Sequence, residues 1–341
     1  MNDAGGSGAS GGGVSSGGGG GCAAGGSNLG GAGDATTSDA MNEAGVPPDA
    51  IGPLADAGDS RAPTEAGDSA GGGFTYDPIK GTKFDEMPLY AGAPPNFKAG
   101  APAETLNANG GIGNVSVPTL RRYAMDGSKA TGFGYLVFPG GGYTMLDMET
   151  HAGKLAERLG PLGIAVFSLK YRVGSGTNDA PGDALIDAKR AVRTVKQNAT
   201  HWAVDSAHLG VIGYSAGSHV ALNLAANFDT GNAGAADPIE KQSSRPAFIG
   251  SMSTWSFGAS TSPFTFPAGV PPTYFCHAQD DTIAPIALPK AVEAQIRAKG
   301  AATVLDFYAT GGHYTCHPGD LSMPGHDWPN KFWPWVQTVV P

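Results

Sequence analysis

Residues 208–219 read His208-Leu-Gly-Val-Ile-Gly-Tyr-Ser-Ala-Gly-Ser-His219 and hold the strongest structural signal in the chain. An apolar run, 209–212, has the composition of a buried strand, and 216–228 has the spacing of a helix. Between them lies the pattern G-x-S-x-G, with Ser215 at its centre. Alone this pattern is weak, because Gly, Ser and Ala are abundant here. At a strand-to-helix turn it predicts a sharp elbow that exposes the Ser215 hydroxyl, with a helix N-terminus behind it.

Strand-like and helix-like segments alternate on both sides of this elbow. The predicted strands are 115–120, 134–138, 164–169, 208–212, 247–252, 273–277 and 304–308. The predicted helices are 149–159, 184–198, 216–228, 286–299 and 330–339. This alternation predicts one α/β domain, in which helices cover both faces of a mostly parallel sheet.

A serine hydroxyl is a poor nucleophile unless a base accepts its proton and a third group orients that base. With a strand–elbow–helix nucleophile, the acid and then the histidine follow in the chain. The strand 273–277 leads to Asp280 and Asp281, and the strand 304–308 leads to His313. We predict His313 as the base and Asp281 as the acid, because Asp281-x-x-x-Pro fits the usual turn. Asp280 remains the alternative, and the other aspartate then shapes the loop.

A glycine run follows the strand 134–138 and reads Pro139-Gly-Gly-Gly-Tyr143. Glycines at such a place leave backbone N–H groups open to a developing oxyanion. We predict that Gly141 and Gly142 donate together with the amide of Ala216. A phosphate-binding loop would continue with Gly-Lys-Ser/Thr, and this sequence does not.

Four aromatic side chains are candidates for the walls of a sugar or acyl site, with packing in the core as the alternative for each. They are Tyr143, Trp255, His277 and Tyr314.

The C-terminal part also carries residue types that bind zinc, namely His313, Cys316, His317 and His326. A zinc site there would take the base from Ser215, and no second ligand pair lies elsewhere, so we predict neither metal nor cofactor. Cys276 and Cys316 flank the proposed acid and base. A disulfide and two buried free thiols both remain open.

Composition separates a tail, 1–73, from a catalytic domain, 74–341. Gly makes up 54 of the 341 residues, and 23 of these lie in residues 1–75, whose net charge of −8 accounts for nearly all of the chain's −9. Such a Gly-rich, acidic, apolar-poor segment predicts disorder. A tether of this kind is common in exported or surface-anchored bacterial proteins, so we expect a secreted, cell-surface or periplasmic location. No signal peptide is visible, and Cys22 is either a stray cysteine or a lipid-attachment residue.

The charge and hydropathy of the chain exclude two classes of partner. There is no basic block to bind nucleic acid, and no run of about 18 apolar residues to span a membrane.

With these motifs assembled, the chain from about Pro88 onward resembles α/β-hydrolase serine esterases of the bacterial acetylesterase type, including acetyl xylan esterases. The resemblance rests on six stretches of sequence: Pro139–Tyr143, Lys170-Tyr-Arg172, Asp187–Ala191, Gly213–Gly217 with His219, His277–Pro285 and Gly311–His313. The chain departs from the family pattern at Ser218, where Gly is usual, and at Ala278, which replaces a common Gly. The stretch 253–272 is also short, which predicts little or no lid and an open, shallow site.

The resemblance implies a serine carboxylester hydrolase that forms an acyl-enzyme on Ser215. The expected substrates are small-molecule or oligosaccharide esters, with removal of short acyl groups, above all acetyl, from acetylated xylan or xylo-oligosaccharides. Two other classes remain. One is a feruloyl or aryl esterase or a peptidase that uses the same triad, and the other is a non-catalytic binding protein on the same fold.

Overall fold

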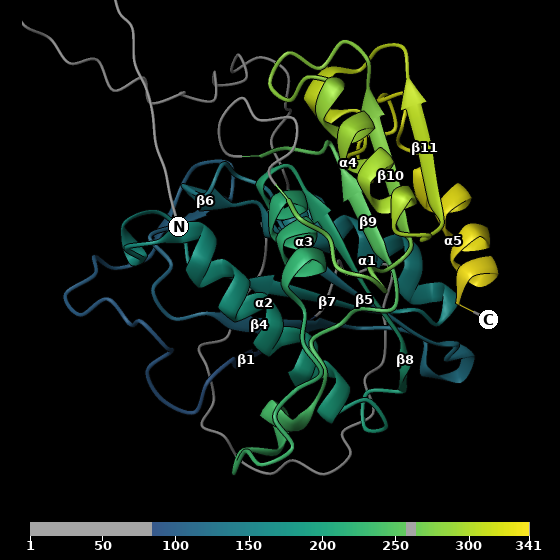
Figure 1. The fold of residues 1–341 in the computed structure, drawn as a ribbon. Coiled ribbons are helices and arrows are strands. Elements are labelled where there is room, and N and C mark those ends of the chain that lie inside the picture. Colours follow the sequence, from purple (N-terminus) through teal and green to yellow (C-terminus); the bar gives the residue numbers. More distant parts are fainter. Residues whose placement is uncertain (1–83, 257–263, 341) are drawn as a thin grey trace, which may run out of the picture. The chain divides into compact units, whose positions relative to one another are not determined.

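Within residues 84–256 and 264–340, which the computed structural model describes, eight strands form one sheet in the order β1-β4-β7-β5-β8-β9-β10-β11 (Figure 1). Its strands are β1 (Phe84–Pro88), β4 (Thr119–Tyr123), β5 (Gly132–Phe138), β7 (Ala165–Lys170), β8 (Val204–Tyr214), β9 (Ile249–Met252), β10 (Thr273–Ala278) and β11 (Thr303–Tyr308). The described α-helices are α1 (Lys154–Leu159), α2 (Ala180–Gln197), α3 (Ala216–Asn227), α4 (Ala287–Ala298) and α5 (Trp328–Val339). The predicted tail, with Cys22, lies outside the described residues.

The sheet is mostly parallel, as the alternation of segments predicts. Every neighbouring pair from β7 to β11 is parallel, and only β4 runs antiparallel to its two neighbours. The carboxyl ends of β5, β8, β10 and β11 therefore lie at one edge of the sheet. In an open α/β sheet, that edge is where functional loops gather.

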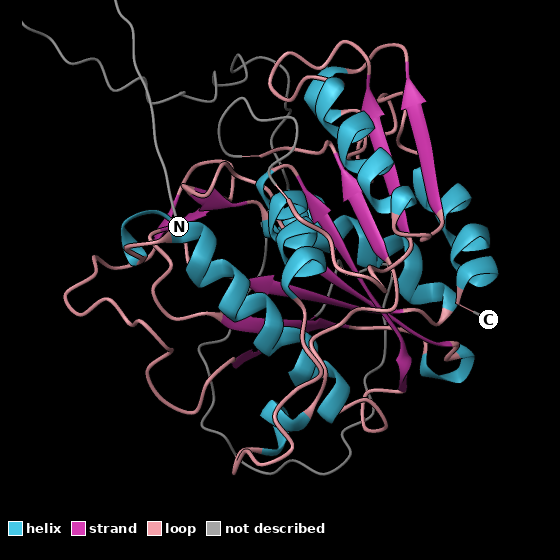
Figure 2. Ribbon diagram, viewed as in Figure 1, coloured by secondary structure: helices cyan, strands magenta, loops and turns pink. Residues whose placement is uncertain are grey.

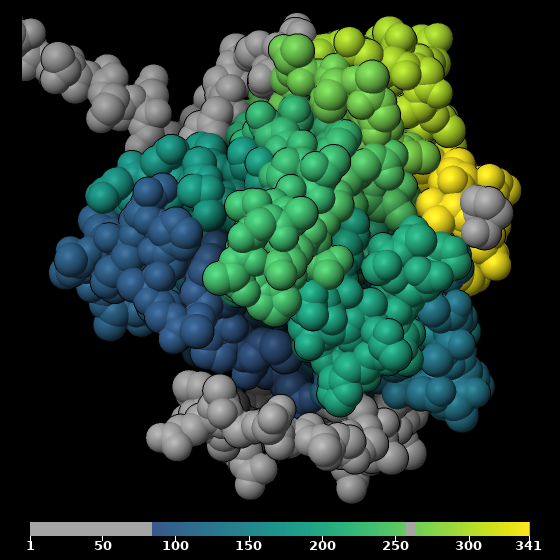
Figure 3. All heavy atoms as spheres, turned by 60° about the horizontal axis from the view of Figure 1, so that its bottom comes forward, coloured from purple at the N-terminus to yellow at the C-terminus, as the bar shows by residue number. Residues whose placement is uncertain are grey.

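Helices cover both faces of the sheet (Figure 2). One apolar cluster packs α2, α3 and α4 on one face, and a second packs α1 and α5 on the other. Within β7 all six side chains are buried, which explains the nearly continuous apolar run in its sequence. Figure 3 shows one face of the molecule, with the yellow C-terminal residues at the right of the view. The α/β architecture predicted from the sequence is confirmed.

Two predicted elements differ from the structure. The strand predicted at 115–120 begins later, as β4 at Thr119, because Val115 instead accepts a hydrogen bond from the amide of Val173 and Pro118 has no N–H. The helix predicted at 149–159 begins with a π-helical turn, Glu149–Gly153, before α1. The helix therefore lies where the sequence predicts it, with a wider first turn, whereas the strand is shorter than predicted.

Short strands at the chain's early end escape the sequence patterns. β1 forms an edge of the main sheet, and a small antiparallel sheet contains β2 (Thr105–Leu106), β3 (Ile112–Gly113) and β6 (Met145–Leu146). Two-residue strands carry no readable periodicity.

The lid prediction concerns residues 253–272, of which 257–263 lie outside the described residues. Of the described part, Phe264, Phe266 and Val270 pack into the core. Among the helices of the described ranges, none combines the length and the apolar composition needed to cross a membrane.

Candidate active site

Ser215 occupies a strained turn between β8 and α3, with φ 50° and ψ −119°. Its glycine neighbours are required by space. A Cβ on Gly213 would lie 2.1 Å from the carbonyl oxygen of Gly217, and a Cβ on Gly217 would lie 1.9 Å from that of Phe138. The G-x-S-x-G pattern therefore marks two places where backbones touch and one residue whose strain points a hydroxyl outward.

His313 and Asp281 complete a chain of hydrogen bonds with Ser215. The Nε2 atom of His313 lies 2.7 Å from Ser215 Oγ, and its Nδ1 atom lies 2.8 Å from Asp281 Oδ2. All three residues are buried, with exposures of 5 to 8%. Ser215 follows β8, Asp281 follows β10, and His313 follows β11, so the shared sheet edge brings together residues up to 98 positions apart. The structure thus brings together the three residues predicted as the triad.

The two adjacent aspartates divide their tasks. Asp281 faces His313, and its second oxygen, Oδ1, accepts hydrogen bonds from the amides of Ile283 and Ala284 at 2.9 and 2.8 Å. Asp280 instead accepts from the amides of Gly311 and Gly312, at 3.3 and 2.8 Å. Asp280 therefore holds the loop before His313, the role predicted for the aspartate that is not the acid.

Asp281 is kept ionised by its partners. Burial alone raises the pKa of its carboxyl group, but the hydrogen bond and charge of His313, with the Ala284 amide, outweigh burial and hold that pKa below its usual value. The group facing His313 is therefore a carboxylate throughout the neutral range.

The glycine loop after β5 adopts backbone angles that favour glycine. Gly141 has φ 133° and Gly142 has φ 60°, and a Cβ on Gly141 would lie 2.2 Å from the carbonyl oxygen of Met145. Within the described residues, no acceptor is found for the amides of Gly141, Gly142 or Ala216. The amide of Gly140, in contrast, donates a hydrogen bond to Nδ1 of His151, at 3.2 Å. These three amides are the ones that the sequence predicts as oxyanion donors.

The four predicted aromatic residues differ in how far they are exposed: two are buried, and two reach the surface. Tyr143 is buried, with its hydroxyl 2.8 Å from Nδ1 of His219, and its ring lies against the half-buried Trp255. Tyr314 is 38% exposed and contacts the edge of His313. His277 has no exposed surface. A side chain without exposed surface cannot line a substrate site, so His277 does not fit its predicted role.

Two further histidines, for which the sequence predicts no role at the serine site, lie beside the elbow. The ring of His151 stacks on Tyr214 at 4.4 Å, and its Nε2 lies 3.2 Å from Nε2 of His317. Burial lowers the pKa of each to about 3, so both rings are neutral and one donates to the other. They are 166 residues apart, and no local pattern signals their contact.

The zinc alternative is contradicted by the chemistry of its ligands. Cys316 is in a disulfide and offers no thiolate, and His313 uses both ring nitrogens for Ser215 and Asp281. Among residues 84–256 and 264–340, no group of three or more His, Cys, Asp or Glu side chains is arranged to hold a metal ion.

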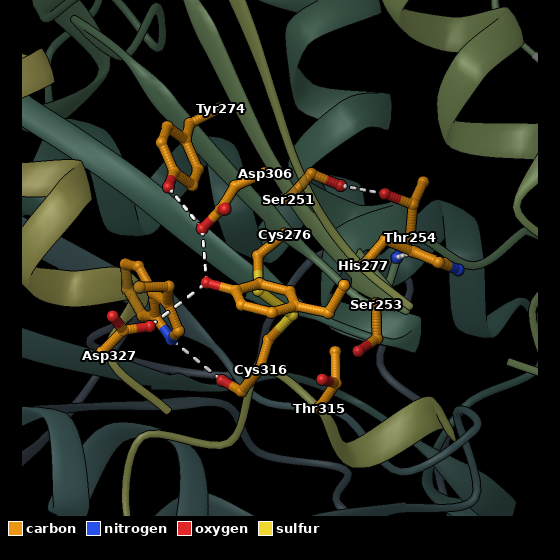
Figure 4. Close-up of a disulfide and its surroundings, with 12 residues drawn as sticks. Ser251, Ser253, Thr254, Tyr274, Cys276, His277, Asp306, Thr315, Cys316 and Asp327 are labelled. Carbon is orange, nitrogen blue, oxygen red and sulfur yellow. Dashed lines mark hydrogen bonds between the residues drawn. A yellow bond between two sulfur atoms is a disulfide. The ribbon is translucent and has the colours of Figure 1, made fainter. Parts of the chain in front are cut away.

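A disulfide joins Cys276 on β10 to Cys316, three residues after His313 (Figure 4). Both cysteines are completely buried. The carbonyl of Cys316 also accepts a hydrogen bond from the indole of Trp328, at 2.9 Å. The histidine loop is therefore tied both to the strand that leads to the acid and to helix α5, which settles the alternative left open between a disulfide and free thiols.

Loss of this disulfide is expected to reduce stability markedly. The bond closes a loop with a sequence separation of 40 residues, and chain-entropy arguments give about 4 kcal/mol for such a loop. Guanidinium unfolding of the double variant Cys276→Ala/Cys316→Ala should show a loss of that order relative to the oxidised protein. The wild-type protein unfolded in the presence of a reductant is the control and should lose a similar amount, and a loss under about 1 kcal/mol in the double variant would contradict this account.

Comparison with known proteins links the centre of the chain to esterases. Residues 135–244 match the model of the BD-FAE family. The segment is 40% identical over 97 residues to endo-1,4-beta-xylanase B of Butyrivibrio fibrisolvens, covering 28% of this chain and 15% of that protein. It is 36% identical over 83 residues to an acetylxylan esterase of Xylanibacter ruminicola, covering 24% of this chain and 16% of that protein. The chain thus matches only about a sixth of the length of these curated relatives.

Solved structures extend the likeness to most of the described fold. An acetyl ester-xyloside bifunctional hydrolase from Caldicellulosiruptor lactoaceticus superposes with a TM-score of 0.63 and 25% identity, covering 75% of this chain and 96% of that one. Esterase 2 of Thermogutta terrifontis, at 19% identity and a TM-score of 0.55, covers 71% and 96% and supports the fold alone. The sheet, the elbow and these likenesses show that the chain has the α/β-hydrolase fold.

Proposed function

We propose that this protein is a serine carboxylester hydrolase that removes short acyl groups, chiefly acetyl, from acetylated xylan or xylo-oligosaccharides. The observation that carries the proposal is the continuous hydrogen-bonded chain from Ser215 through His313 to Asp281. Such a chain has the order and the contacts that activate a serine for acyl transfer.

The proposed reaction has two halves. Ser215 Oγ attacks the ester carbonyl carbon while Nε2 of His313 takes the hydroxyl proton, and the amides of Gly141, Gly142 and Ala216 bind the oxyanion. The tetrahedral intermediate then expels the alcohol, which receives that proton from His313. A water molecule, deprotonated by His313, attacks the acyl-enzyme in the same way and releases the acid. No cofactor enters this scheme.

The substrate class rests on two supports. The relatives that match the central segment include an acetylxylan esterase and a xylanase. Near Ser215, aromatic rings also pack closely around His219: Tyr143 hydrogen-bonds to its ring, and Phe264 lies 5.4 Å from it between ring centroids. We propose that these rings, grouped around a residue one helical turn after Ser215, bound the acyl site and so favour a small acyl group over a long one.

A series of p-nitrophenyl esters from acetate to dodecanoate tests this substrate class. We expect kcat/KM to be highest for acetate and to fall with each added length of chain, because longer acyl groups meet the aromatic rings around His219. Release of acetate from acetylated xylo-oligosaccharides should then exceed release of ferulate from a feruloyl ester. An optimum at long chains, or activity on feruloyl or peptide substrates alone, would replace the proposal with another chemistry of the same triad.

We also propose that the protein functions outside the reducing cytoplasm, in a secreted, cell-surface or periplasmic setting. The support is the buried Cys276–Cys316 bond, since structural disulfides persist mainly in oxidising compartments. Thiol labelling of the native protein under denaturing conditions tests this, and two titratable thiols at these positions would contradict it.

A further inference from the structure

His277 lies next to the proposed triad, near the Asp281 oxygen, Oδ2, that also faces His313. It is the second-last residue of β10 and is completely buried. Its Nε2 atom lies 2.7 Å from the carbonyl oxygen of Ala284 and 3.4 Å from Asp281 Oδ2. On the other side of the ring, Nδ1 lies 3.0 Å from the amide nitrogen of Thr254 (Figure 4).

These partners fix the protonation of the ring. An amide N–H can only donate, so Nδ1 accepts from Thr254. A carbonyl can only accept, so Nε2 carries the hydrogen and donates to Ala284. Burial lowers the pKa of His277 below its usual value, against the opposing pull of the Ala284 carbonyl and of Asp281. The ring is therefore neutral and present as a single tautomer.

On the acid side, His277 closes the turn that holds the carboxylate. Ala284 donates its amide to Asp281 Oδ1 and accepts from His277 with its carbonyl. Both backbone groups of Ala284 are thus hydrogen-bonded, one to Asp281 Oδ1 and one to His277. Asp281 Oδ2 remains to accept from His313. The Nε2–H of His277 also presents the positive end of its dipole to this same oxygen.

On the nucleophile side, the contacts of His277 continue to the elbow. The next residue after Thr254, Trp255, donates its amide to Ser218 Oγ at 3.0 Å, and Ser218 Oγ donates to the carbonyl of Ser215 at 2.7 Å. A path of hydrogen bonds, joined by the Thr254–Trp255 peptide bond, therefore runs from the Asp281 turn through His277 to the backbone of Ser215.

We infer that His277 is a positioning residue, which keeps Asp281 and Ser215 in register with His313 without touching substrate. This inference rests on the proposed hydrolase function and adds a member to its site. Its loss would displace the acid turn relative to the elbow, and small displacements of reacting groups cost on the order of 10²-fold in rate.

The test uses two replacements of His277 in the full-length protein. Phenylalanine fills the space but has no ring nitrogens, and glutamine places an amide donor near the position of Nε2. On p-nitrophenyl acetate we expect His277→Phe to lower kcat about 10²-fold with KM within about twofold, and His277→Gln to recover much of the loss. Tyr274→Phe is the control on the same strand, since it removes only a hydrogen bond to Asp306, and should leave kcat unchanged.

A second readout does not depend on turnover. The low-field proton resonance of the His313–Asp281 hydrogen bond should be lost or moved in His277→Phe and retained in His277→Gln. Wild-type kcat and an unchanged resonance in both variants would overturn the inference. Equal losses of kcat in both variants, in proportion to their losses of thermal stability, would also overturn it. If the wild type is inactive on all esters but its resonance still changes in His277→Phe, the proposed hydrolase function is wrong and the positioning role of His277 is retained.

Discussion

Replacing Ser215 by alanine is expected to lower kcat on p-nitrophenyl acetate by about 10⁶-fold, as loss of the nucleophile does in other serine triads. The physical reason is that no acyl-enzyme can form, and His313 is left with no hydroxyl to deprotonate. The oxyanion amides and the fold remain, so a small rate above that of water should persist. Stopped assays at high enzyme concentration measure it.

Ser322→Ala is a suitable control for this experiment, because its exposed side chain hydrogen-bonds only to the neighbouring Asp320. A fluorophosphonate probe should label the wild type and this control at Ser215 and leave Ser215→Ala unlabelled. Activity of Ser215→Ala within about a hundredfold of wild type would refute the acyl-enzyme mechanism, since triad removal costs far more.

The second large effect is expected for Asp281→Asn, which should lower kcat about 10⁴-fold. Oδ1 of Asp281 accepts two backbone amides, from Ile283 and Ala284. The carbonyl oxygen of an asparagine must take that place, and its NH₂ group then faces Nδ1 of His313. The ring is forced to accept there and to carry its hydrogen on Nε2, where it cannot take the proton of Ser215.

Asp280→Asn is the matched comparison, one residue away and with the same change of charge. An asparagine oxygen can still accept from the amide of Gly312, so the loop before His313 should hold and kcat should fall less than about tenfold, as loss of one exposed hydrogen bond implies. Steady-state kinetics of both variants side by side decide between the two aspartates. A larger loss for Asp280→Asn would reverse their assignment.

Much of the site can be predicted from the sequence, because steric constraints on neighbouring residues select the amino acids at the elbow and in the glycine loop. At the two glycines around Ser215 any Cβ would clash with a backbone carbonyl, and positive φ angles favour glycine in the loop after β5. The chain order of nucleophile, acid and base follows from the order in which parallel strands end at one edge. The steric constraints act over a few residues, and the chain order follows the repeat of strand and helix. Both can be recognised in the amino-acid sequence alone.

The weakest predictions concern single side chains whose surroundings come from distant segments. His277 is of a residue type that often binds substrates, but it is completely buried, because the loop after β9 and the turn after β10 enclose it. The contact of His151 with His317 has no local signature.

From the sequence alone, therefore, the α/β architecture and the elbow at Ser215 are determined, because strand and helix periodicity and glycine sterics are local properties. Only the tertiary structure decides that Asp281 rather than Asp280 faces His313, that Cys276 and Cys316 are joined, and that His277 points inward. Those outcomes depend on how β10, β11 and the loops beyond them are placed side by side. Such placement is set by packing across the sheet between residues far apart in the chain.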